Sequence, residues 1–460
     1  MCGIFGIHGH PDAAAVSHLG LYSLQHRGQE SAGIVATGLD GSAHAVKMMG
    51  LVSEGLRGQD LTQMEGDVAI GHTRYSTAGS STIENAQPML VRFRDGHIAL
   101  AHNGNLINAT EMRRELEDLG SIFTSTMDSE VLVHRIARSS ATTPEAKLAE
   151  ALQDVEGAYS LVVTIGDTLM AARDPRGWRP LVMGRLGSSY VFASETCALD
   201  IIGAETVREV EPGEIVAVDR EGVRSLHPLA KKESRRCVFE YVYFARPDSR
   251  VFGGSVDRAR RHLGRRLARE NPAPTADLVF AVPDSSNSAA LGFAEESKLP
   301  YELALIRNHY VGRTFIQPTQ AGRDEKVKVK YNAVKEVLAG KSVVMVDDSI
   351  VRGTTTRGLV AMVRAAGARE VHMRVSSPPI TGPCYYGIDT PNREELIAAN
   401  MTIPEIAKAI GVDSLGYLSL EGMLASVPDG PDGFCHACFS GEYPTAPPAD
   451  PQKLRFGCGC

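Results

Sequence analysis

The sequence has no long apolar run and no export signal. None of its apolar runs approaches the ~18 residues that a membrane span needs. Its N-terminus lacks the basic stretch and apolar stretch that together mark a signal peptide. Excess positive charge is also missing, because the net charge is −7, which removes a global electrostatic case for binding nucleic acid. We therefore expect a cytoplasmic protein with no membrane or nucleic-acid partner.

Internal repeats and long low-complexity stretches are also absent from the sequence. The chain has 460 residues, which is too long for one ordinary hydrophobic core. Its apolar fraction of 43% and charged fraction of 22% are typical of a globular protein. We expect two domains.

The first half has the pattern of short strands with a few helices. The strand patterns lie at 68–71, 98–101, 160–165 and 190–193, and the helical patterns at 110–119 and 129–138. Asp128 is the expected N-cap of the second helix. Strands in runs with a few helices indicate an α+β layered domain. The charged stretch 228–236 is the expected linker.

Strands and helices alternate in the second half. The expected elements are helix 257–270, strand 278–282, helix 333–338, strand 342–346, loop 347–356, helix 357–366 and strand 370–375. Such alternation predicts an α/β domain with a parallel sheet, in which ligands bind at the carboxyl ends of the strands. From about residue 428 the tail is rich in Pro, Gly and Cys, and we expect it to be mostly irregular.

The strongest local signal is a β-branched strand that ends in two acids and continues into a loop rich in threonine. The backbone N–H groups of residues 353–356 stand where a helix begins, which suits an anion, and Arg352 adds positive charge. The carboxylates of Asp347 and Asp348 repel phosphate, so they suit sugar hydroxyls or a divalent cation. An ordinary helix N-cap would explain the threonines alone, but it does not explain the full string.

This string resembles the 5-phosphoribosyl-1-pyrophosphate (PRPP) loop of type I phosphoribosyltransferases. The resemblance implies that Asp347 and Asp348 contact the ribose hydroxyls and the shell of one Mg²⁺ per subunit. It assigns the 5-phosphate to the loop that follows, with Ser349, Arg352, Gly353, Thr354, Thr355 and Thr356. Ser285, in the stretch 283–286, matches a position beside the pyrophosphate and Mg²⁺.

A cysteine stands at the second position, before the apolar, glycine-punctuated stretch 4–7. If Met1 is removed, Cys2 carries a thiol and a free α-amine, which titrates near about pH 7.7–8. An N-terminal amine is a known activator of a nucleophile. By its position alone, Cys2 is more readily explained as an incidental small residue near a frayed end. The stretch after it, however, has the pattern of a buried strand.

The opening 2–6 resembles class II glutamine amidotransferases, whose N-terminal cysteine attacks the side-chain amide of glutamine. Further matching strings lie at 25–33, 71–77 and 101–105. The resemblance implies an N-terminal nucleophile (Ntn) hydrolase sandwich with αββα layers. No propeptide precedes Cys2, so removal of Met1 is expected to suffice. A chain that kept Met1 should lack glutaminase activity.

The matching strings also have chemical interpretations. A tetrahedral intermediate needs an oxyanion hole, which the side-chain amide of Asn103 and the backbone N–H of Gly104 can form. Arg74 suits the glutamine carboxylate as a bidentate donor. The family pattern implies that Asp128 binds the glutamine amine. His72 and His102 receive no catalytic role.

A glutamine-hydrolysing head followed by a PRPP-binding domain resembles the amidophosphoribosyltransferase family over nearly the whole chain. The segments 240–249 and 310–318 also match, the second as a mobile loop over the PRPP site. Arg307 and Tyr310 are expected to contact PRPP. The family usually has Lys-Asn-Arg before this tyrosine, whereas this chain has Arg307 and His309, which changes the donor geometry. The implied units are a glutamine amidotransferase domain, a phosphoribosyltransferase domain and a Cys-containing tail, at 1–231, 232–428 and 429–460.

The implied reaction converts PRPP and glutamine to 5-phosphoribosylamine, glutamate and pyrophosphate, the first committed step of purine synthesis. Purine nucleotides are the expected feedback inhibitors, and a homotetramer or homodimer is the expected assembly. One alternative joins the same head to another synthase, but the loop 347–356 argues against it. Another is a non-catalytic sensor of PRPP or purine nucleotides. A sensor has no need of the set Cys2, Arg74, Asn103 and Asp128.

The chain has eight cysteines, which in the cytoplasm favour metal binding or catalysis over disulfides. Those that match the cluster-bearing kind of the family are Cys237, Cys384, Cys435 and Cys438. The match implies one structural [4Fe–4S] cluster per subunit. Zinc held by four cysteines is the alternative, and spacing does not exclude it. Cys197 is expected to be a small buried side chain, and Cys458 and Cys460 have no expected role.

Overall fold

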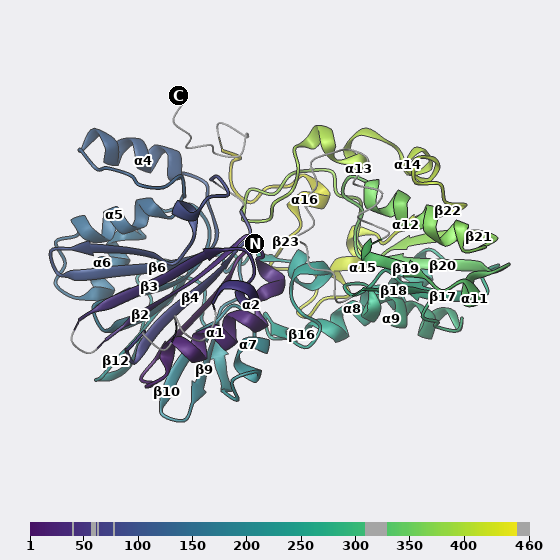
Figure 1. Ribbon diagram of the computed structural model, residues 1–460. Coiled ribbons are helices and arrows are strands. Elements are labelled where there is room, and N and C mark those ends of the chain that lie inside the picture. The colour runs from purple at the N-terminus through teal and green to yellow at the C-terminus, as the bar shows by residue number, and fades with distance from the viewer. Residues whose placement is uncertain (39–40, 57–60, 62–63, 77–78, 309–328, 449–460) are drawn as a thin grey trace.

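The computed structural model describes residues 1–38, 41–56, 61, 64–76, 79–308 and 329–448. The chain forms two units side by side, purple to teal and teal to yellow in Figure 1, and the N-terminus lies between them. An irregular stretch at 228–235 joins the units. Within the described ranges, no helix is both long and apolar enough to cross a membrane.

Two antiparallel sheets form the first unit. One contains β1 (Gly3–His8), β2 (Ser31–Thr37), β3 (Ala43–Met49), β4 (Val68–Arg74), β9 (Val182–Leu186), β10 (Ser189–Ala193) and β11 (Glu205–Glu209). The other contains β5 (Met89–Phe93), β6 (Gly96–Leu106), β7 (Gly157–Ile165), β8 (Thr168–Arg173), β12 (Ile215–Asp219) and β13 (Gly222–Leu226). Their strand orders are β11-β9-β10-β1-β4-β2-β3 and β13-β12-β8-β7-β6-β5.

Helices cover the outer face of each sheet. Helices α1 (Ala13–Ser23) and α7 (Cys197–Asp200) pack on the first sheet, and α4 (Ala109–Asp118), α5 (Glu130–Arg138) and α6 (Pro144–Ala151) pack on the second. Successive side chains of β1 point to opposite faces of the sheet and so enter two different hydrophobic cores. Ile4 faces the other sheet, whereas Phe5 faces α1. Gly20 allows this close packing, since a Cβ there would lie 2.3 Å from the Phe5 ring. The αββα sandwich expected from the sequence is confirmed.

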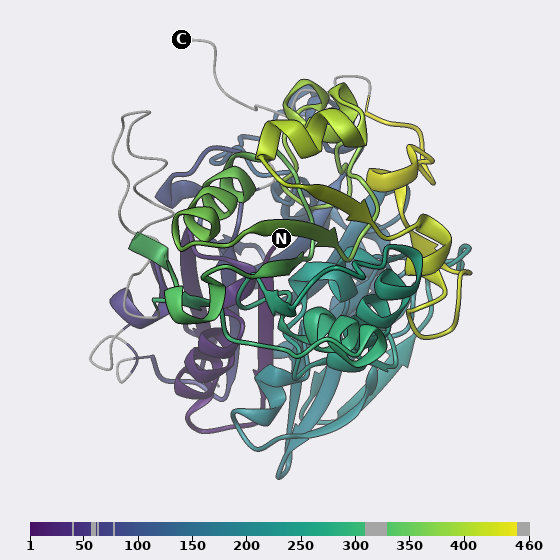
Figure 2. The same cartoon turned by 90° about the vertical axis from the view of Figure 1, so that its right-hand side faces the viewer.

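The second unit has a parallel sheet in the order β17-β20-β21-β22. Its strands are β17 (Leu278–Ala281), β20 (Ser342–Asp347), β21 (Glu370–Val375) and β22 (Ser414–Tyr417). Helices α8 (Val256–Glu270) and α9 (Asn287–Ser297) cover one face, and α12 (Thr354–Ala365) and α14 (Ile403–Ile410) cover the other, as Figure 2 shows. The predicted α/β domain is therefore confirmed.

Shorter elements complete the two units. The helical ones are η1 (Gln25–Arg27), α2 (Val52–Gly55), η2 (Ile83–Asn85), the π-helix η3 (Glu240–Phe244), α11 (Lys335–Leu338), η4 (Arg393–Glu395), α13 (Ile397–Asn400), α15 (Leu420–Leu424) and α16 (Ala437–Ser440). The strands are β14 (Arg236–Cys237), β15 (Arg250–Val251), β16 (Gly254–Ser255), β18 (Leu305–Arg307), β19 (Tyr331–Ala333) and β23 (Phe434–Cys435). β14 pairs in parallel with β23, so the tail returns to the start of the second unit.

Some local predictions were wrong. The N-cap of α5 is Ser129, because the Asp128 carboxylate instead accepts a hydrogen bond from the Leu106 backbone N–H. The helix expected at 333–338 is only Lys335–Leu338, because Ala333 pairs with Leu305 across β18 and β19. Tertiary pairing thus outweighs the helix propensity of alanine.

Candidate active sites

Cys2 is held by its own backbone at the junction of the two units. Its backbone N–H donates to Asn103 Oδ1 at 3.1 Å, and its carbonyl oxygen accepts from Arg27 Nε at 2.9 Å. The thiol sulfur lies 3.7 Å from the Tyr75 carbonyl oxygen. Met1 packs in the core of the second unit, so Cys2 lies at the boundary between the units. Contacts on both sides of Cys2 therefore fix the position of its thiol.

Asn103 and Gly104 lie in β6 beside Cys2. The Nδ2 atom of Asn103 is buried and has no hydrogen-bond partner among the described residues. A buried donor without a partner is costly, so an oxyanion formed next to Cys2 would be stabilised by it. Gly104 has φ +155°, and a Cβ there would lie 1.9 Å from the Ala158 carbonyl oxygen. Only glycine fits this position of the strand.

Arg74 ends β4, and its partners include a carboxylate that the sequence analysis did not assign. Its Nη1 atom lies 2.8 Å from Glu30 Oε1 and donates to the Ser80 carbonyl oxygen at 3.0 Å. Burial raises the pKa of Glu30, but hydrogen bonds from Ser76 and Ser81 and the charge of Arg74 lower it overall. Glu30 lies within the matching string 25–33, which was the signal available for it.

Asp128 is buried and already has three polar neighbours. Its carboxylate accepts from the backbone N–H groups of Leu106 and Ser129, both at 2.8 Å. Its Oδ1 atom also lies 3.7 Å from His102 Nδ1. Burial lowers the pKa of His102, but the Asp128 charge outweighs burial and raises it overall. His102 is therefore an electrostatic partner of Asp128, the residue predicted to bind the glutamine amine.

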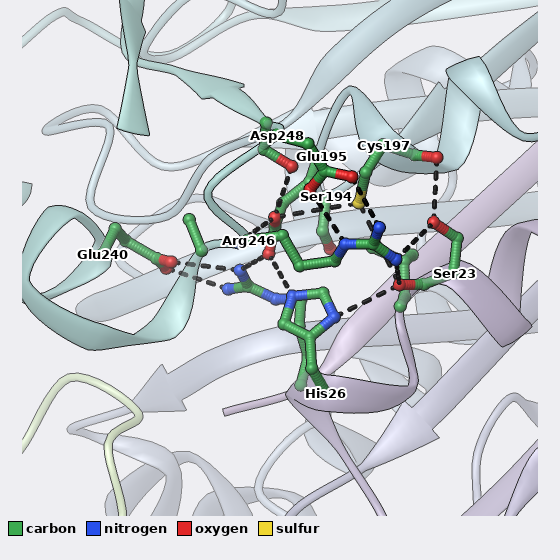
Figure 3. Close-up of polar contacts among 12 residues, drawn as sticks. Ser23, His26, Ser194, Glu195, Cys197, Glu240, Arg246 and Asp248 are labelled. Atoms are coloured by element: carbon green, nitrogen blue, oxygen red, sulfur yellow. Dashed lines mark hydrogen bonds and ion pairs between the residues drawn. The ribbon is translucent and has the colours of Figure 1, made fainter. Parts of the chain in front are cut away.

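A buried ion-pair network adjoins Cys2 and joins the two units (Figure 3). Arg27 pairs with Glu195 at 2.5 Å and with Glu240 at 2.8 Å, and all three side chains are fully buried. Glu195 also contacts His26, the Arg246 backbone N–H and the Ser249 hydroxyl. Glu240 and Arg246 belong to the second unit, so the residue that holds the Cys2 carbonyl is anchored from across the boundary.

This network was missed by the sequence analysis, although its members other than Glu195 lie in the matching strings 25–33 and 240–249. For Glu195 and Glu240, the available signal was a carboxylate inside an otherwise apolar stretch. Burial raises the pKa of Glu195, but the charges of His26 and Arg27 outweigh it and hold the pKa far below its ordinary value. The two neighbouring cations therefore hold the Glu195 carboxylate in its ionised form.

Asp347 ends β20 and Asp348 follows it, at the carboxyl edge of the parallel sheet and next to the loop that follows β17. Ser285 Oγ donates to Asp348 at 2.5 Å, and Ser286 Oγ donates to Asp347 at 3.1 Å. The Ser349 hydroxyl also donates to Asp348, at 2.6 Å. Burial raises the pKa of both carboxyls, and that of Asp347 is raised further by its neighbour's charge. Two adjacent buried carboxylates and a hydroxyl suit a divalent cation that completes its shell with substrate oxygens.

The loop after these acids leads into the N-terminus of α12. Gly353 is the N-cap, with φ +74°, and the helix begins at Thr354 rather than after the threonines. The first-turn N–H groups thus face the loop, as anion binding needs. Thr354 and Thr355 are exposed, whereas the Thr356 side chain is buried.

The Nε atom of Arg352 points away from the loop 347–356, which is the predicted phosphate-binding loop. This atom donates to Glu395 Oε2 at 2.8 Å. A cavity of about 300 Å³ separates the loop from α13 and α14, and its lining includes Arg352, Gly353 and Thr354. An anion bound by the loop would therefore compete with Glu395 for the guanidinium of Arg352.

Arg307 lies in β18 and forms an ion pair with Asp284 in the loop that follows β17. Both residues line a cavity of about 150 Å³. The structure thus brings Arg307 to the same sheet edge as the two acids. Tyr310, His309 and the predicted mobile loop at 310–318 lie outside the described residues.

Four cysteines from three segments lie near one another, and they are Cys237, Cys384, Cys435 and Cys438. Cys237 and Cys435 are register partners across β14 and β23. Burial raises the pKa of Cys237 and Cys438, and the neighbouring sulfurs, Cys384 included, raise it further. A single zinc ion would bring four sulfurs to about 3.8 Å from one another, because Zn–S bonds are about 2.3 Å. Among the described residues, no group of three or more His, Cys, Asp or Glu is placed to hold a metal ion.

The comparisons with known proteins cover both units. Residues 72–200 match the family model described as a glutamine amidotransferase domain. The amidophosphoribosyltransferase of Bacillus subtilis is 51% identical over 452 residues, which are 96% of this chain and 94% of that protein. Its namesake from Archaeoglobus fulgidus is 48% identical over 460 residues, which are 98% of this chain and 99% of that protein.

Two solved structures are similar over nearly their whole length. One is glutamine PRPP amidotransferase from B. subtilis complexed with ADP and GMP, with a TM-score of 0.91, 50% identity and 98% coverage of both chains. The other is described as the allosteric regulatory enzyme of purine biosynthesis, with a TM-score of 0.92 and 50% identity, covering 98% of this chain and 97% of that one. The chain belongs to the amidophosphoribosyltransferase family.

Proposed function

We propose that this chain converts PRPP and glutamine to 5-phosphoribosylamine, glutamate and pyrophosphate, the first committed step of purine synthesis. The observation that carries the proposal is the arrangement at Cys2. Asn103 accepts a hydrogen bond from the Cys2 backbone, and within the described residues its buried Nδ2 donor has no partner. A nucleophile next to a free donor is the arrangement that amide hydrolysis needs.

Loss of Met1 would give Cys2 a free α-amine beside its thiol. This amine takes the thiol proton as the sulfur attacks the amide carbon of glutamine, and the adduct oxygen is stabilised by Asn103 and Gly104. The carbon–nitrogen bond then breaks, the nitrogen takes the proton and leaves as ammonia, and water hydrolyses the thioester to glutamate. Arg74 is the proposed ligand of the glutamine carboxylate, and Asp128 of its amine.

PRPP binds, in this proposal, at the carboxyl edge of the parallel sheet. Asp347 and Asp348 contact the ribose hydroxyls. The 5-phosphate is held by the residues of the following loop, which are Ser349, Arg352, Gly353, Thr354, Thr355 and Thr356. Arg307 and Tyr310 contact the remainder of PRPP. Ammonia forms a bond to C1 as the bond from C1 to the pyrophosphate oxygen breaks.

One Mg²⁺ per subunit fits the oxygen ligands Ser285, Asp347 and Asp348. When bound, it would offset negative charge on the departing pyrophosphate. We also propose one [4Fe–4S] cluster per subunit, held by Cys237, Cys384, Cys435 and Cys438. The four sulfurs influence one another's pKa, so they lie near one another, and four thiolates are the usual ligand number of such a cluster.

Further parts of the proposal concern organisation and regulation. The proposed domains are 1–231 and 232–428, with a tail at 429–460 that supplies two cluster ligands. The B. subtilis relative was solved with ADP and GMP, which supports purine nucleotides as regulators of this chain. We propose a homotetramer or homodimer in the cytoplasm.

The test is pyrophosphate release from PRPP with Mg²⁺ and either glutamine or ammonia as nitrogen donor. We expect Cys2→Ala to lose the glutamine-dependent rate and to keep the ammonia-dependent rate. The matched control is Cys197→Ala, another buried cysteine, whose thiol pKa burial raises to about 12. This control should keep both rates. Absence of glutamine-dependent release in the unmodified enzyme would refute the proposed function.

A further inference from the structure

A short segment of the second unit reaches the strand that carries the proposed oxyanion hole. Residues 385–387, here called the backing segment, follow Cys384 and lie against β6. The Asn105 side chain donates from Nδ2 to the Tyr385 carbonyl oxygen at 3.0 Å. Gly387 approaches more closely, since a Cβ there would lie 2.8 Å from the carbonyl carbon and oxygen of Gly104. The two glycine backbones therefore meet without any side chain between them.

The backing segment is held by residues of the first unit and of the tail. The ring of Tyr386 stacks on that of Trp178, with centroids 3.9 Å apart and planes at 21°. Arg179 Nε donates to the Tyr386 carbonyl oxygen at 2.9 Å, and the Tyr386 hydroxyl lies 2.9 Å from Thr445 Oγ1. Trp178, Arg179 and Tyr386 are all buried. Stacking and charge-assisted hydrogen bonds thus fix the segment on three sides.

Gly104 is consequently confined from two directions. The Ala158 carbonyl oxygen occupies the space on one side, 1.9 Å from where a Cβ would stand, and the Gly387 backbone occupies the other. Close-packed backbone atoms transmit displacement because no flexible side chain separates them. Any shift of Gly387 must therefore move the Gly104 carbonyl group, and through the Gly104 Cα atom it alters the direction of the Gly104 N–H, which is one of the oxyanion donors.

We propose that the backing segment is a positioning element of the oxyanion hole, acting through Gly104 and Asn105 without touching glutamine. The inference rests on the proposed function of Cys2 and Asn103. It assigns a role to Tyr385, Tyr386 and Gly387, and it makes correct geometry of the glutamine site depend on a segment of the PRPP-binding unit. A glutaminase unit separated from the second unit would lack this support.

The test is Gly387→Ala, with rates measured separately for glutamine and for ammonia. We expect the glutamine-dependent kcat to fall about a hundredfold, because a misplacement of about 1 Å costs about that factor. The glutamine KM and the ammonia-dependent rate should change little. Gly340→Ala is the matched control: Gly340 also has a positive φ, +72°, but a Cβ there would meet nothing within 4 Å. The control should keep both rates.

A second variant, Asn105→Ala, removes only the hydrogen bond to Tyr385 and decides the question if Gly387→Ala does not fold. Its glutamine-dependent kcat should fall about tenfold, in line with one lost hydrogen bond of about 1 kcal/mol or more. Alkylation of Cys2 by iodoacetamide forms no oxyanion, so its rate should be unchanged in both variants.

Three results would overturn the positioning role. They are full glutamine activity in the variants, equal loss of the two rates, and alkylation that slows in parallel with turnover. An unmodified enzyme that does not hydrolyse glutamine would instead refute the proposed function itself, so the two failures are distinguishable.

Discussion

Two buried histidines, His72 and His102, have pKa values that the fold shifts in opposite directions. His72 stands opposite Ile4 in the pairing of β4 with β1. Its Nε2 atom lies 3.0 Å from the His102 carbonyl oxygen, and burial lowers its pKa to about 3. His72 is therefore neutral near pH 7 and cannot supply a proton there. His102, beside Asp128, has a raised pKa instead.

The neutral state of His72 makes stability depend on pH. The unfolded chain protonates this histidine near pH 6.5, whereas the folded chain does so only near pH 3. Stability is thus fully present above pH 6.5 and is lost as pH falls toward 3, because the unfolded state binds the extra proton in that window. We expect His72→Gln to flatten the decline of the urea midpoint between pH 6.5 and 4. Each pH unit accounts for about 1.4 kcal/mol.

The control for this measurement is His44→Gln, at an exposed position in β3. It should leave the pH dependence as it is in the unmodified chain. Equal slopes for the His72 variant and the unmodified chain would contradict the prediction, because the cost of keeping His72 neutral would then be absent.

For single residues, the roles of those within the matching strings could be predicted from the sequence. Their partners from distant parts of the sequence could not be predicted. Arg74 and Asn103 carry their chemistry in the local sequence. Glu240 is 213 positions from Arg27, and nothing local indicates that the two form an ion pair. Long-range pairs of this kind follow from how the two units dock. Breaking such a buried pair costs about 3–5 kcal/mol, far more than an exposed pair contributes.

The phosphate loop and α12 illustrate what a sequence pattern resolves for an element. The pattern locates the strand, the two acids and the anion-binding turn. It places the helix start three residues late, because threonine is a weak helix former and because the pattern does not show that Gly353, in a left-handed conformation that glycine adopts readily, is the N-cap. The helix expected at 333–338 is short for a different reason, since pairing of β19 with β18 claims Ala333.

Gly353→Ala tests whether this turn holds the 5-phosphate. Alanine at φ +74° is strained by about 1–3 kcal/mol, and its Cβ would lie 2.7 Å from Ile397 Cδ1. Relief of that strain would move the turn, so we expect the KM for PRPP to rise about tenfold or more. The increase should appear with glutamine and with ammonia alike. Hydrolysis of glutamine alone should keep its KM.

Gly411→Ala provides the comparison for this variant. Gly411 ends α14 with φ +81°, and a Cβ there would meet only Val360 Cγ1, at 4.0 Å. Its KM for PRPP should stay near that of the unmodified enzyme. An unchanged KM in Gly353→Ala would place the phosphate elsewhere.

Across the whole molecule, the two units are not independent bodies. Met1 packs in the core of the second unit, and the backing segment packs on β6 of the first. The sequence predicts both units and their order, because each has its own motifs and periodicity. The sequence does not predict the interface between the units, since the residues that form it are far apart in the sequence. The proposed boundary at 231/232 therefore separates two segments of the chain, but residues from both sides of it surround the Cys2 site.

The tail also packs on the start of the second unit, because β23 pairs with β14 and brings Cys435 beside Cys237. If the proposed cluster is correct, a chain ending at residue 448 should keep its full iron and sulfide, although it lacks Cys458 and Cys460. Cys435→Ser should lose most of both, since one of four ligands is gone. Anaerobic iron, sulfide and zinc analysis of the two purified variants measures this directly. Loss of iron in the shortened chain would move the ligand set to Cys458 and Cys460, and zinc without sulfide would replace the cluster by a single-ion site.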